Sequence, residues 1–368
     1  MPGESRRQNM AVLRNRQKEL PMSRCKPIAA LLLVCGLAEA APEQVPLYRE
    51  IKDWVVACDN LRGCQALSAT EDYGHTPLRL ELRRAAGAQA PLQLSLHYAG
   101  QTEYFPLLLD GEPLSAVADA LQLAQDDDEL LLSAEGAEAQ ALLAELRNGE
   151  QLRMAVDGED EAVVSLRGLS AALLLMDSVQ GRVDGVTALY RPGTRPASEV
   201  PVAPPAPRLR PYPGTAPLAE AESRAIAEAV MAATRSAWFE EEMNSTPEAE
   251  AFALNEHEAL VLIRTWCAAY NCDFAVYRVS RQPPYEERDL QLDPLPLEHD
   301  GLSGAVGYRP ETGELAYLHK GRGLADCGGA GSWRFDGERF QLASFSFLSR
   351  CAGGNPGEWP ELWRVVEP

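Results

Sequence analysis

The sequence is poor in the residues and spacings that mark most metal sites and nucleic-acid-binding proteins. Its 368 residues carry 34 basic against 54 acidic side chains, a formal net charge of −20. Nucleic acids and anionic membrane surfaces are bound mainly through Lys and Arg, so we expect neither as a partner. The five histidines are scattered, and no His-x-x-x-His, His-Glu-x-x-His or Cys-x-x-Cys spacing occurs. We therefore expect no metal and no cofactor.

A nucleophile for covalent catalysis is also hard to find. Residues 301–304, Gly-Leu-Ser-Gly, are one residue short of the Gly-x-Ser-x-Gly elbow, and no convincing strand precedes them. We interpret Ser303 as a turn residue. Two carboxylates that meet in space remain an open alternative, because so acidic a chain offers many such pairs. We expect a protein that is not an enzyme, with a hydrolase as the alternative.

No apolar run is long enough to cross a membrane, which takes about 20 residues. Residues 22–40 instead have the pattern of a secretory signal: two basic residues, an apolar stretch at 28–37 and a small-x-small site ending at Ala40. We expect translation to start at Met22, cleavage after Ala40, a periplasmic location and no membrane insertion after signal removal. A lipoprotein anchored at Cys35 is the alternative, although the preceding valine is larger than such sites usually carry.

Cleavage after Ala40 would remove two of the eight cysteines and leave 27 basic against 51 acidic groups. Six cysteines in an oxidising compartment indicate disulfides, for which sequence alone permits 15 pairings. Clustering along the chain favours the three local pairs. A zinc site is the less favoured alternative, because these cysteines and the histidines do not have the spacing of zinc ligands. The predicted bridges are Cys58–Cys64, Cys267–Cys272 and Cys327–Cys351.

Residues 41–190 alternate strand-like and helix-like patterns, which predicts an α+β domain, mainly antiparallel β. The amphipathic periods indicate helices at 113–124 and 137–147, the second ending in a left-handed cap at Asn148-Gly149. Strands are expected at 53–58, 78–84 and 92–98, followed by a hairpin of residues 151–156 and 162–167 across an acidic tip. A third helix is expected from Leu169 onward.

Residues 191–217 contain nine prolines and show neither the helical nor the strand period of apolar residues. This composition predicts an extended linker between two domains. Whether this linker is free or packed does not follow from composition. The second domain, residues 218–368, should combine one long helix at 218–244 with antiparallel hairpins. Asp336-Gly337 predicts a type I′ turn in the last hairpin, and the glycine-rich residues 328–331 are interpreted as a turn.

Four segments carry a resemblance to a known family: KDWVVACDNLRGCQAL, VVSLRGLSAALLLMDSVQGR, WCAAYNCDFAVYR, and GLADCGGAGSWRFDG with the later EWPELWR. They resemble the exported bacterial family called domain of unknown function 1176. The first two are also similar to invasion-associated locus B proteins. The resemblance implies a periplasmic protein with no assigned activity, so it transfers no catalytic residue.

These observations predict a non-catalytic binding or inhibitor-type module of the cell envelope, whose partner is an envelope protein or glycan. A hydrolase acting on envelope material is the alternative. Binding would require an exposed patch of aromatic and arginine side chains. The same tryptophans suit the core of a β-domain equally well. The candidate patch consists of Trp333, Arg350, Trp359, Trp363 and Arg364.

Overall fold

The structure is a computed structural model. It describes residues 44–69, 77–100, 102, 106–114, 121–125, 129–156, 162–239, 246–297 and 302–367. Residues 42–368 form one compact unit. The predicted signal peptide, its cleavage site and the acidic hairpin tip at 157–161 lie outside the described residues. No described helix is long and apolar enough to span a bilayer.

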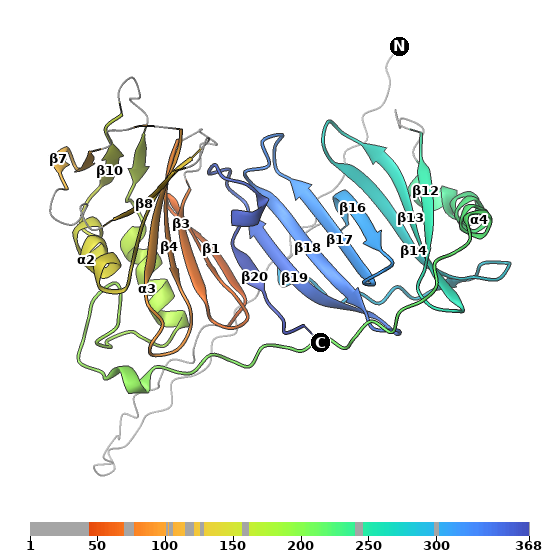
Figure 1. The fold of residues 1–368 in the computed structure, drawn as a ribbon, viewed down its shortest axis with the longest axis horizontal. Helices are drawn as coiled ribbons and strands as arrows, with labels where there is room; N and C mark the ends of the chain where they lie inside the picture. Colours follow the sequence, from red (N-terminus) through yellow and green to blue (C-terminus); the bar gives the residue numbers. More distant parts are fainter. Residues whose placement is uncertain are drawn as a thin grey trace, which may run out of the picture. The chain divides into compact units, whose positions relative to one another are not determined.

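The first sheet is antiparallel and has seven strands in the order β1-β2-β3-β4-β5-β9-β8 (Figure 1). Helices α2 (Gly136–Leu146) and α3 (Leu169–Val179) pack against one of its faces and share its apolar core. The strands expected at 53–58, 78–84 and 92–98 and the helices expected at 137–147 and from Leu169 onward are confirmed. The strands are β1 (Leu47–Ile51), β2 (Trp54–Cys58), β3 (Cys64–Ser68), β4 (Leu78–Arg84), β5 (Gln93–Ala99), β8 (Gln122–Gln125) and β9 (Glu129–Glu135).

A smaller sheet of four strands extends the same core, in the order β11-β10-β6-β7. Its members are β6 (Leu107–Leu109), β7 (Glu112–Pro113), β10 (Gln151–Met154) and β11 (Val163–Ser165). The predicted β10–β11 hairpin is confirmed, but the helix expected at 113–124 is wrong at both ends, and its middle, residues 115–120, lies outside the described residues. Pairing with neighbouring strands overrides the helical period there: β7 pairs with β6, and β8 pairs with β9.

The left-handed cap expected after α2 is also absent. Neither Asn148 nor Gly149 has a positive φ. Gly149 is required for space instead, because a Cβ there would lie 2.4 Å from Cδ1 of Leu109.

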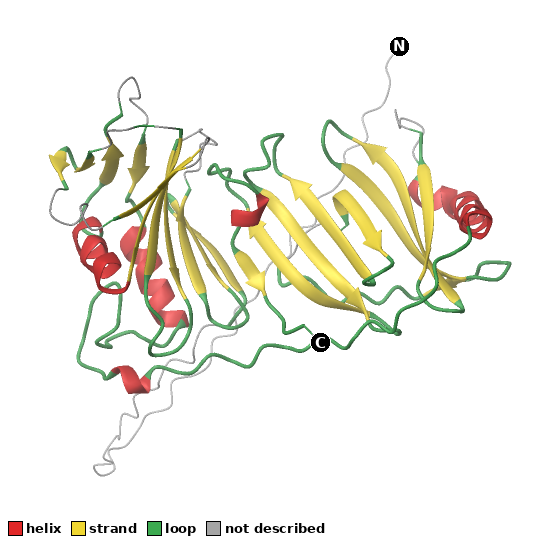
Figure 2. Cartoon of the chain, in the orientation of Figure 1, coloured by secondary structure: helices red, strands yellow, loops and turns green. Residues whose placement is uncertain are grey.

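The third sheet has nine strands, in the order β12-β13-β14-β16-β17-β18-β19-β20 with β15 paired to β14. The long helix α4 (Glu220–Trp238) packs on β12 and β13 through Ile226, Ala227 and Val230. Figure 2 shows this strand-rich composition, which confirms the α+β, mainly antiparallel class. The strands are β12 (Glu248–Ala253), β13 (Glu258–Cys267), β14 (Cys272–Ser280), β15 (Glu287–Arg288), β16 (Ser303–Arg309), β17 (Glu314–Lys320), β18 (Gly328–Phe335), β19 (Phe340–Leu348) and β20 (Glu361–Trp363).

Two expectations for the last hairpin are wrong. The glycine-rich residues 328–331 form the first half of β18, where the lack of side chains lets neighbouring groups approach. A Cβ at Gly331 would lie 2.7 Å from the Tyr317 ring. The turn is not type I′ either, because Gly337 has a positive φ and Asp336 does not. A hydrogen bond from Asp336 N to Arg339 O closes a longer loop.

Three disulfides stiffen the chain locally: Cys58–Cys64 joins β2 to β3, Cys267–Cys272 joins β13 to β14, and Cys327–Cys351 brackets the β18–β19 hairpin. These are the pairs that the clustering favours.

The proline-rich residues 191–217 contain one short 3-10 helix, η1 (Ala197–Glu199). Further along, the segment runs beside the end of the chain, where Val366 N donates to Pro207 O at 2.8 Å and Leu209 N donates to Val366 O at 3.2 Å. The Tyr212 ring packs against the third sheet's core. The division into two domains at this segment stays a prediction.

The edge of the first sheet contacts the end of β19. The Tyr48 and Ser349 hydroxyl oxygens are 2.8 Å apart, and the Tyr48 ring meets Phe347 edge-on. Arg350 donates to the Glu50 carboxylate and to the Ala69 carbonyl oxygen. Trp359 and the Cys327–Cys351 disulfide pack with Val55 and Leu67 in a small apolar cluster between the two sheets. These contacts form one side of the site described next.

Candidate functional site

The first sheet presents a row of polar side chains on the face opposite α2 and α3. Strand residues alternate between faces, so when leucines of β4 and β5 enter the core, their neighbours point the other way. Arg83 of β4 is in register with Gln65 of β3 and with Gln93 of β5. Strand pairing therefore brings two amides and a guanidinium from three strands side by side.

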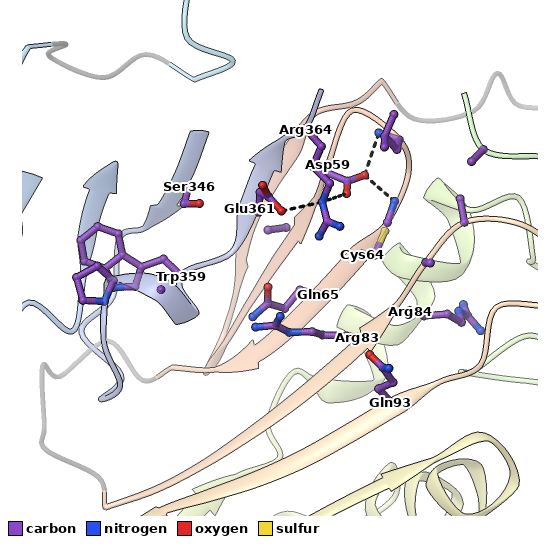
Figure 3. A pocket seen from close by; sticks show the side chains of 18 residues that line it. Asp59, Cys64, Gln65, Arg83, Arg84, Gln93, Ser346, Trp359, Glu361 and Arg364 are labelled. Carbon is purple, nitrogen blue, oxygen red and sulfur yellow. Dashed lines mark hydrogen bonds and ion pairs between the residues drawn. The ribbon is translucent and has the colours of Figure 1, made fainter. Parts of the chain in front are cut away.

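The C-terminal segment forms the opposite wall. Asn60, in the Cys58–Cys64 turn, holds β20 with a backbone bond from its N–H to Leu362 O. Its side chain exchanges hydrogen bonds with the Arg364 backbone at 2.8 and 2.9 Å. The 3-10 turn η2 (Pro356–Glu358) precedes β20 and is capped by Asn355. Between this wall and the sheet lies a cleft of about 590 Å³, shown in Figure 3.

Two carboxylates and one guanidinium form a fixed cluster in the cleft. Arg364 Nε lies 2.9 Å from Asp59 Oδ2 and 2.8 Å from Glu361 Oε2, and Figure 3 shows its side chain between the two acids. Asp59 is 2% exposed and accepts backbone hydrogen bonds from Leu61 and Gly63. Burial raises the pKa of Asp59 above its usual range despite these bonds, and burial raises the pKa of Glu361 as well.

A second guanidinium, that of Arg83, also lines the cleft. It is half-exposed and pairs with Glu81, a buried neighbour on the same strand. Burial lowers the pKa of Arg83, and the charges of Arg364 and Arg79 lower it further. Mutual repulsion among these cations would decrease if an anion entered the cleft.

The cleft wall also contains hydrogen-bond donors that nothing in the described chain satisfies. Gln65 is 8% exposed and Trp359 3%, and both line the cleft. Among the described residues, neither Gln65 Nε2 nor Trp359 Nε1 has a hydrogen-bond partner. Buried polar groups are nearly always paired, and an unpaired one costs about 1–3 kcal/mol. These two donors are therefore the clearest mark of a ligand site in the cleft.

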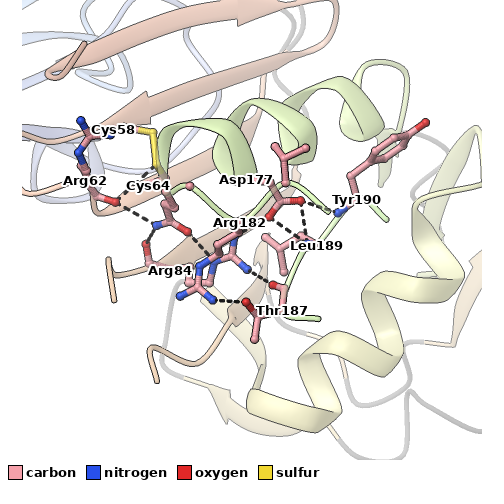
Figure 4. Close-up of polar contacts among 12 residues, drawn as sticks. Cys58, Arg62, Cys64, Arg84, Asp177, Arg182, Thr187, Leu189 and Tyr190 are labelled. Carbon is pink, nitrogen blue, oxygen red and sulfur yellow. Dashed lines mark hydrogen bonds and ion pairs between the residues drawn. A yellow bond between two sulfur atoms is a disulfide. The ribbon is translucent and has the colours of Figure 1, made fainter. Parts of the chain in front are cut away.

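Arg84 lies at the edge of the same cleft, but its charge is already neutralised within the fold (Figure 4). It donates to Asp177 Oδ1 at 2.8 Å, Gln180 Oε1 at 2.7 Å and Thr187 O at 3.0 Å. Burial lowers the pKa of Arg84 to about 10, and the neighbouring charge of Arg182 acts in the same direction. This network fastens α3 and the loop after it to β4, and so fixes the floor of the cleft.

The structure separates the five predicted patch residues. Trp333 is buried in the third sheet's core and donates to Asp293 O at 2.8 Å. Arg350 is buried against the first sheet. Trp363 is half-buried, and its indole N–H donates a hydrogen bond to Leu342 O. Only Trp359 and Arg364 of the five line the cleft.

Sequence reasoning missed the cleft's other polar residues, among them Asp59, Gln65, Arg83 and Glu361. For Gln65 and Arg83 the signal was the alternation within β3 and β4, which does not show which strands become neighbours; Asp59, in the turn after β2, and Glu361, in β20, had no such signal. The order of strand pairing in the structure shows which strands are neighbours.

Ser303 is the first residue of β16, so its interpretation as a turn residue is wrong. Its Oγ lies 2.8 Å from Nδ1 of His319, which suggests a catalytic pair. The hydrogen-bond directions argue against that pair acting as nucleophile and base. Asn271 Oδ1 accepts from Lys320 N, so its Nδ2, 3.3 Å from His319 Nε2, is a donor. Nε2 therefore accepts, Nδ1 carries the proton, and the serine oxygen receives it rather than losing its own.

Two comparisons with known proteins find relatives of this chain. Residues 48–366 match the model of the family described as "Protein of unknown function (DUF1176)". The chain is 32% identical over 358 residues to "Uncharacterized protein YpfG" of Escherichia coli strain K12, which covers 90% of this chain and 96% of that protein. No solved structure matches the chain. The cleft and its walls lie wholly inside the matched range, and the chain belongs to the DUF1176 family.

Proposed function

We propose that this chain is an exported periplasmic protein that binds a carboxylate-bearing envelope molecule in the cleft and does not turn it over. The observation that carries the proposal is the buried, unpartnered amide of Gln65 beside Arg83 on the cleft wall. An oxygen-rich anion would accept from the amide and pair with the guanidinium. The shared chemistry, a carboxylate with nearby hydrogen-bond acceptors, is present both in acidic peptides and in muropeptide glycans.

Electrostatics supports an anion in spite of the chain's negative net charge. The half-exposed guanidinium of Arg83 lines the cleft, where a bound carboxylate would be partly shielded from water, whereas the charge of Arg364 is already balanced by Asp59 and Glu361 and it would contribute as a hydrogen-bond donor. Arg364 is positioned by two acids and by Asn60, so it needs little ordering on binding. Disulfide Cys58–Cys64 stiffens the turn that holds it.

The test uses Gln65→Leu, which has an unusual expected signature. Removing an unsatisfied buried amide should leave the free energy of unfolding unchanged or slightly higher, because no hydrogen bond is lost. Binding of ligand should fall at least tenfold. Calorimetric titration with soluble muropeptides in one arm and acidic peptides in another distinguishes the two sources.

Arg224→Ala is the matched control for Arg83→Met, since Arg224 is an exposed arginine on α4 that pairs with the exposed Glu220. We expect Arg83→Met to abolish binding and Arg224→Ala to leave it intact. If neither probe binds the wild-type protein, or if both cleft variants bind as tightly as the wild type, the proposal fails.

One observation favours the alternative, a hydrolase acting on envelope material. Asp59 and Glu361 are two carboxylates with raised pKa in one cleft, which is the arrangement that acid–base catalysis uses. Against it, both Asp59 oxygens are already engaged, one by two N–H groups and the other by Arg364. Hydrolysis of peptidoglycan or peptide probes that Glu361→Gln abolished would establish the hydrolase instead of the binding module.

A further inference from the structure

Beside the cleft, three side chains from three different elements converge outside the site described above. They are His97 of β5, Glu129 of β9 and Glu358 of η2, and their ligand atoms all lie within 4.8 Å of one another. We propose that these three residues bind a divalent zinc ion. One imidazole and two carboxylates are ligands that zinc commonly accepts, with a fourth position left for water.

The surroundings of His97 fit a metal ligand. Its Nδ1 lies 2.8 Å from Glu129 Oε1, and its Nε2 lies 3.3 Å from Ser95 Oγ. A zinc-bound histidine donates its other ring N–H to an oxygen, which fixes the ring's orientation. In the structure Nδ1 donates to the Glu129 carboxylate; on metal binding this proton would shift to Nε2, which faces Ser95, so that Nδ1 can coordinate. No proton has to leave the site.

The charged group that contacts these ligands most closely in the described part of the chain is Arg79. Its guanidinium lies 2.6 Å from Glu358 Oε2 and donates to Gly353 O at 2.8 Å. Two carboxylates and one guanidinium leave a net charge of about −1 when His97 is neutral, which favours a cation. Arg79 leaves the second oxygen of Glu358 for the ion.

The second cluster with metal-ligand atoms, Asp326 with Cys327 and Cys351, does not compete for this role. Both of its sulfurs are joined in a disulfide, so neither is available as a thiolate. The His97 site has a structural consequence that the other lacks. An ion there would tie η2, and thus the C-terminal wall of the cleft, to the first sheet.

The experiment titrates the untagged, oxidised full-length mature chain with zinc chloride alone, by calorimetry and by thermal unfolding, with magnesium chloride as a parallel arm. We expect one zinc ion per chain, a midpoint of unfolding that rises with zinc concentration, and no such rise with magnesium. His97→Ala and Glu129→Gln should each weaken zinc binding at least tenfold. His257→Ala, a change at an exposed histidine, is the matched control and should bind as the wild type does.

Glu129→Gln keeps the proposal falsifiable if His97→Ala fails to fold, because it preserves shape and volume. X-ray absorption of the zinc complex should show one nitrogen and otherwise oxygen ligands. The absence of saturable zinc binding, or binding that Glu129→Gln leaves unchanged, would overturn the proposal.

Discussion

Replacing Asp177 by Ala should destabilise the protein strongly. Asp177 is 1% and Arg84 is 2% exposed, so the change leaves a guanidinium buried without its counter-charge. Removal of one partner of a buried ion pair costs about 3–5 kcal/mol. The N–H groups of Leu189 and Tyr190 also lose their acceptor. Arg84 keeps Gln180 as an acceptor, so we expect a loss of about 3–5 kcal/mol and not more.

This loss is measured by urea unfolding of the mature chain, with tryptophan fluorescence as the readout. The free energies of unfolding can be compared if the variant and the wild type have the same m-value. The double variant Asp177→Ala with Arg84→Met should recover part of it, because the uncompensated charge is gone. Glu220→Ala is the control, since it breaks an exposed ion pair worth less than about 1 kcal/mol. A loss below about 1 kcal/mol for Asp177→Ala, or no recovery in the double variant, would refute the view that this network anchors α3.

Three further predictions concern the contact beside the cleft, its response to pH, and export. Arg350→Ala should lower the free energy of unfolding, measured in urea, by about 2–4 kcal/mol, because carbonyl oxygens including that of Ala69 lose their donor. A loss under about 0.5 kcal/mol would contradict this. Burial raises the pKa of Glu358, but the charge and hydrogen bond of Arg79 outweigh it, so the folded pKa lies below the unfolded value. The stability from this group is complete above the unfolded pKa of about 4.3 and is lost as pH falls through the folded pKa, so Glu358→Gln should narrow the difference in unfolding free energy between pH 6 and pH 3. If Glu358→Gln leaves the difference in unfolding free energy between pH 6 and pH 3 unchanged, the pKa of Glu358 is not lowered in the folded protein. N-terminal sequencing of the exported protein should begin at Ala41, whereas a lipid-modified Cys35 would make it an anchored lipoprotein.

Much of the fold was predictable because local patterns agree with the pairing that forms. Residues 78–84 and 92–98 alternate cleanly, and their strands formed as expected. Residues 122–125 have a helical period but become a strand, since an open edge of β9 was available for pairing. Glycines at 328–331 look like a turn, yet the tight approach of the Tyr317 ring requires them in β18.

The candidate site was predictable only in part. Trp359 and Arg364 stood out as large side chains near the end of the chain, but their burial and partners depend on contacts with the first sheet. Gln65 and Arg83 are ordinary polar residues of alternating strands, and only the register between β3 and β4 places them together. His97 and Glu358 are far apart in the sequence, so no spacing pattern indicates the metal-ligand cluster that they form.

The most direct test of the binding proposal follows two nitrogen-bound proton signals by NMR during titration with the soluble muropeptides and acidic peptides used above. These are the indole N–H of Trp359 and the side-chain amide of Gln65, both without a partner in the described part of the chain. The account predicts that both signals shift and saturate together with one of the two probes. The indole N–H of Trp238, already bonded to Thr234 in α4, should stay in place. Cleft signals that remain unmoved by every carboxylate-bearing probe, or that move no more than Trp238, would contradict the account.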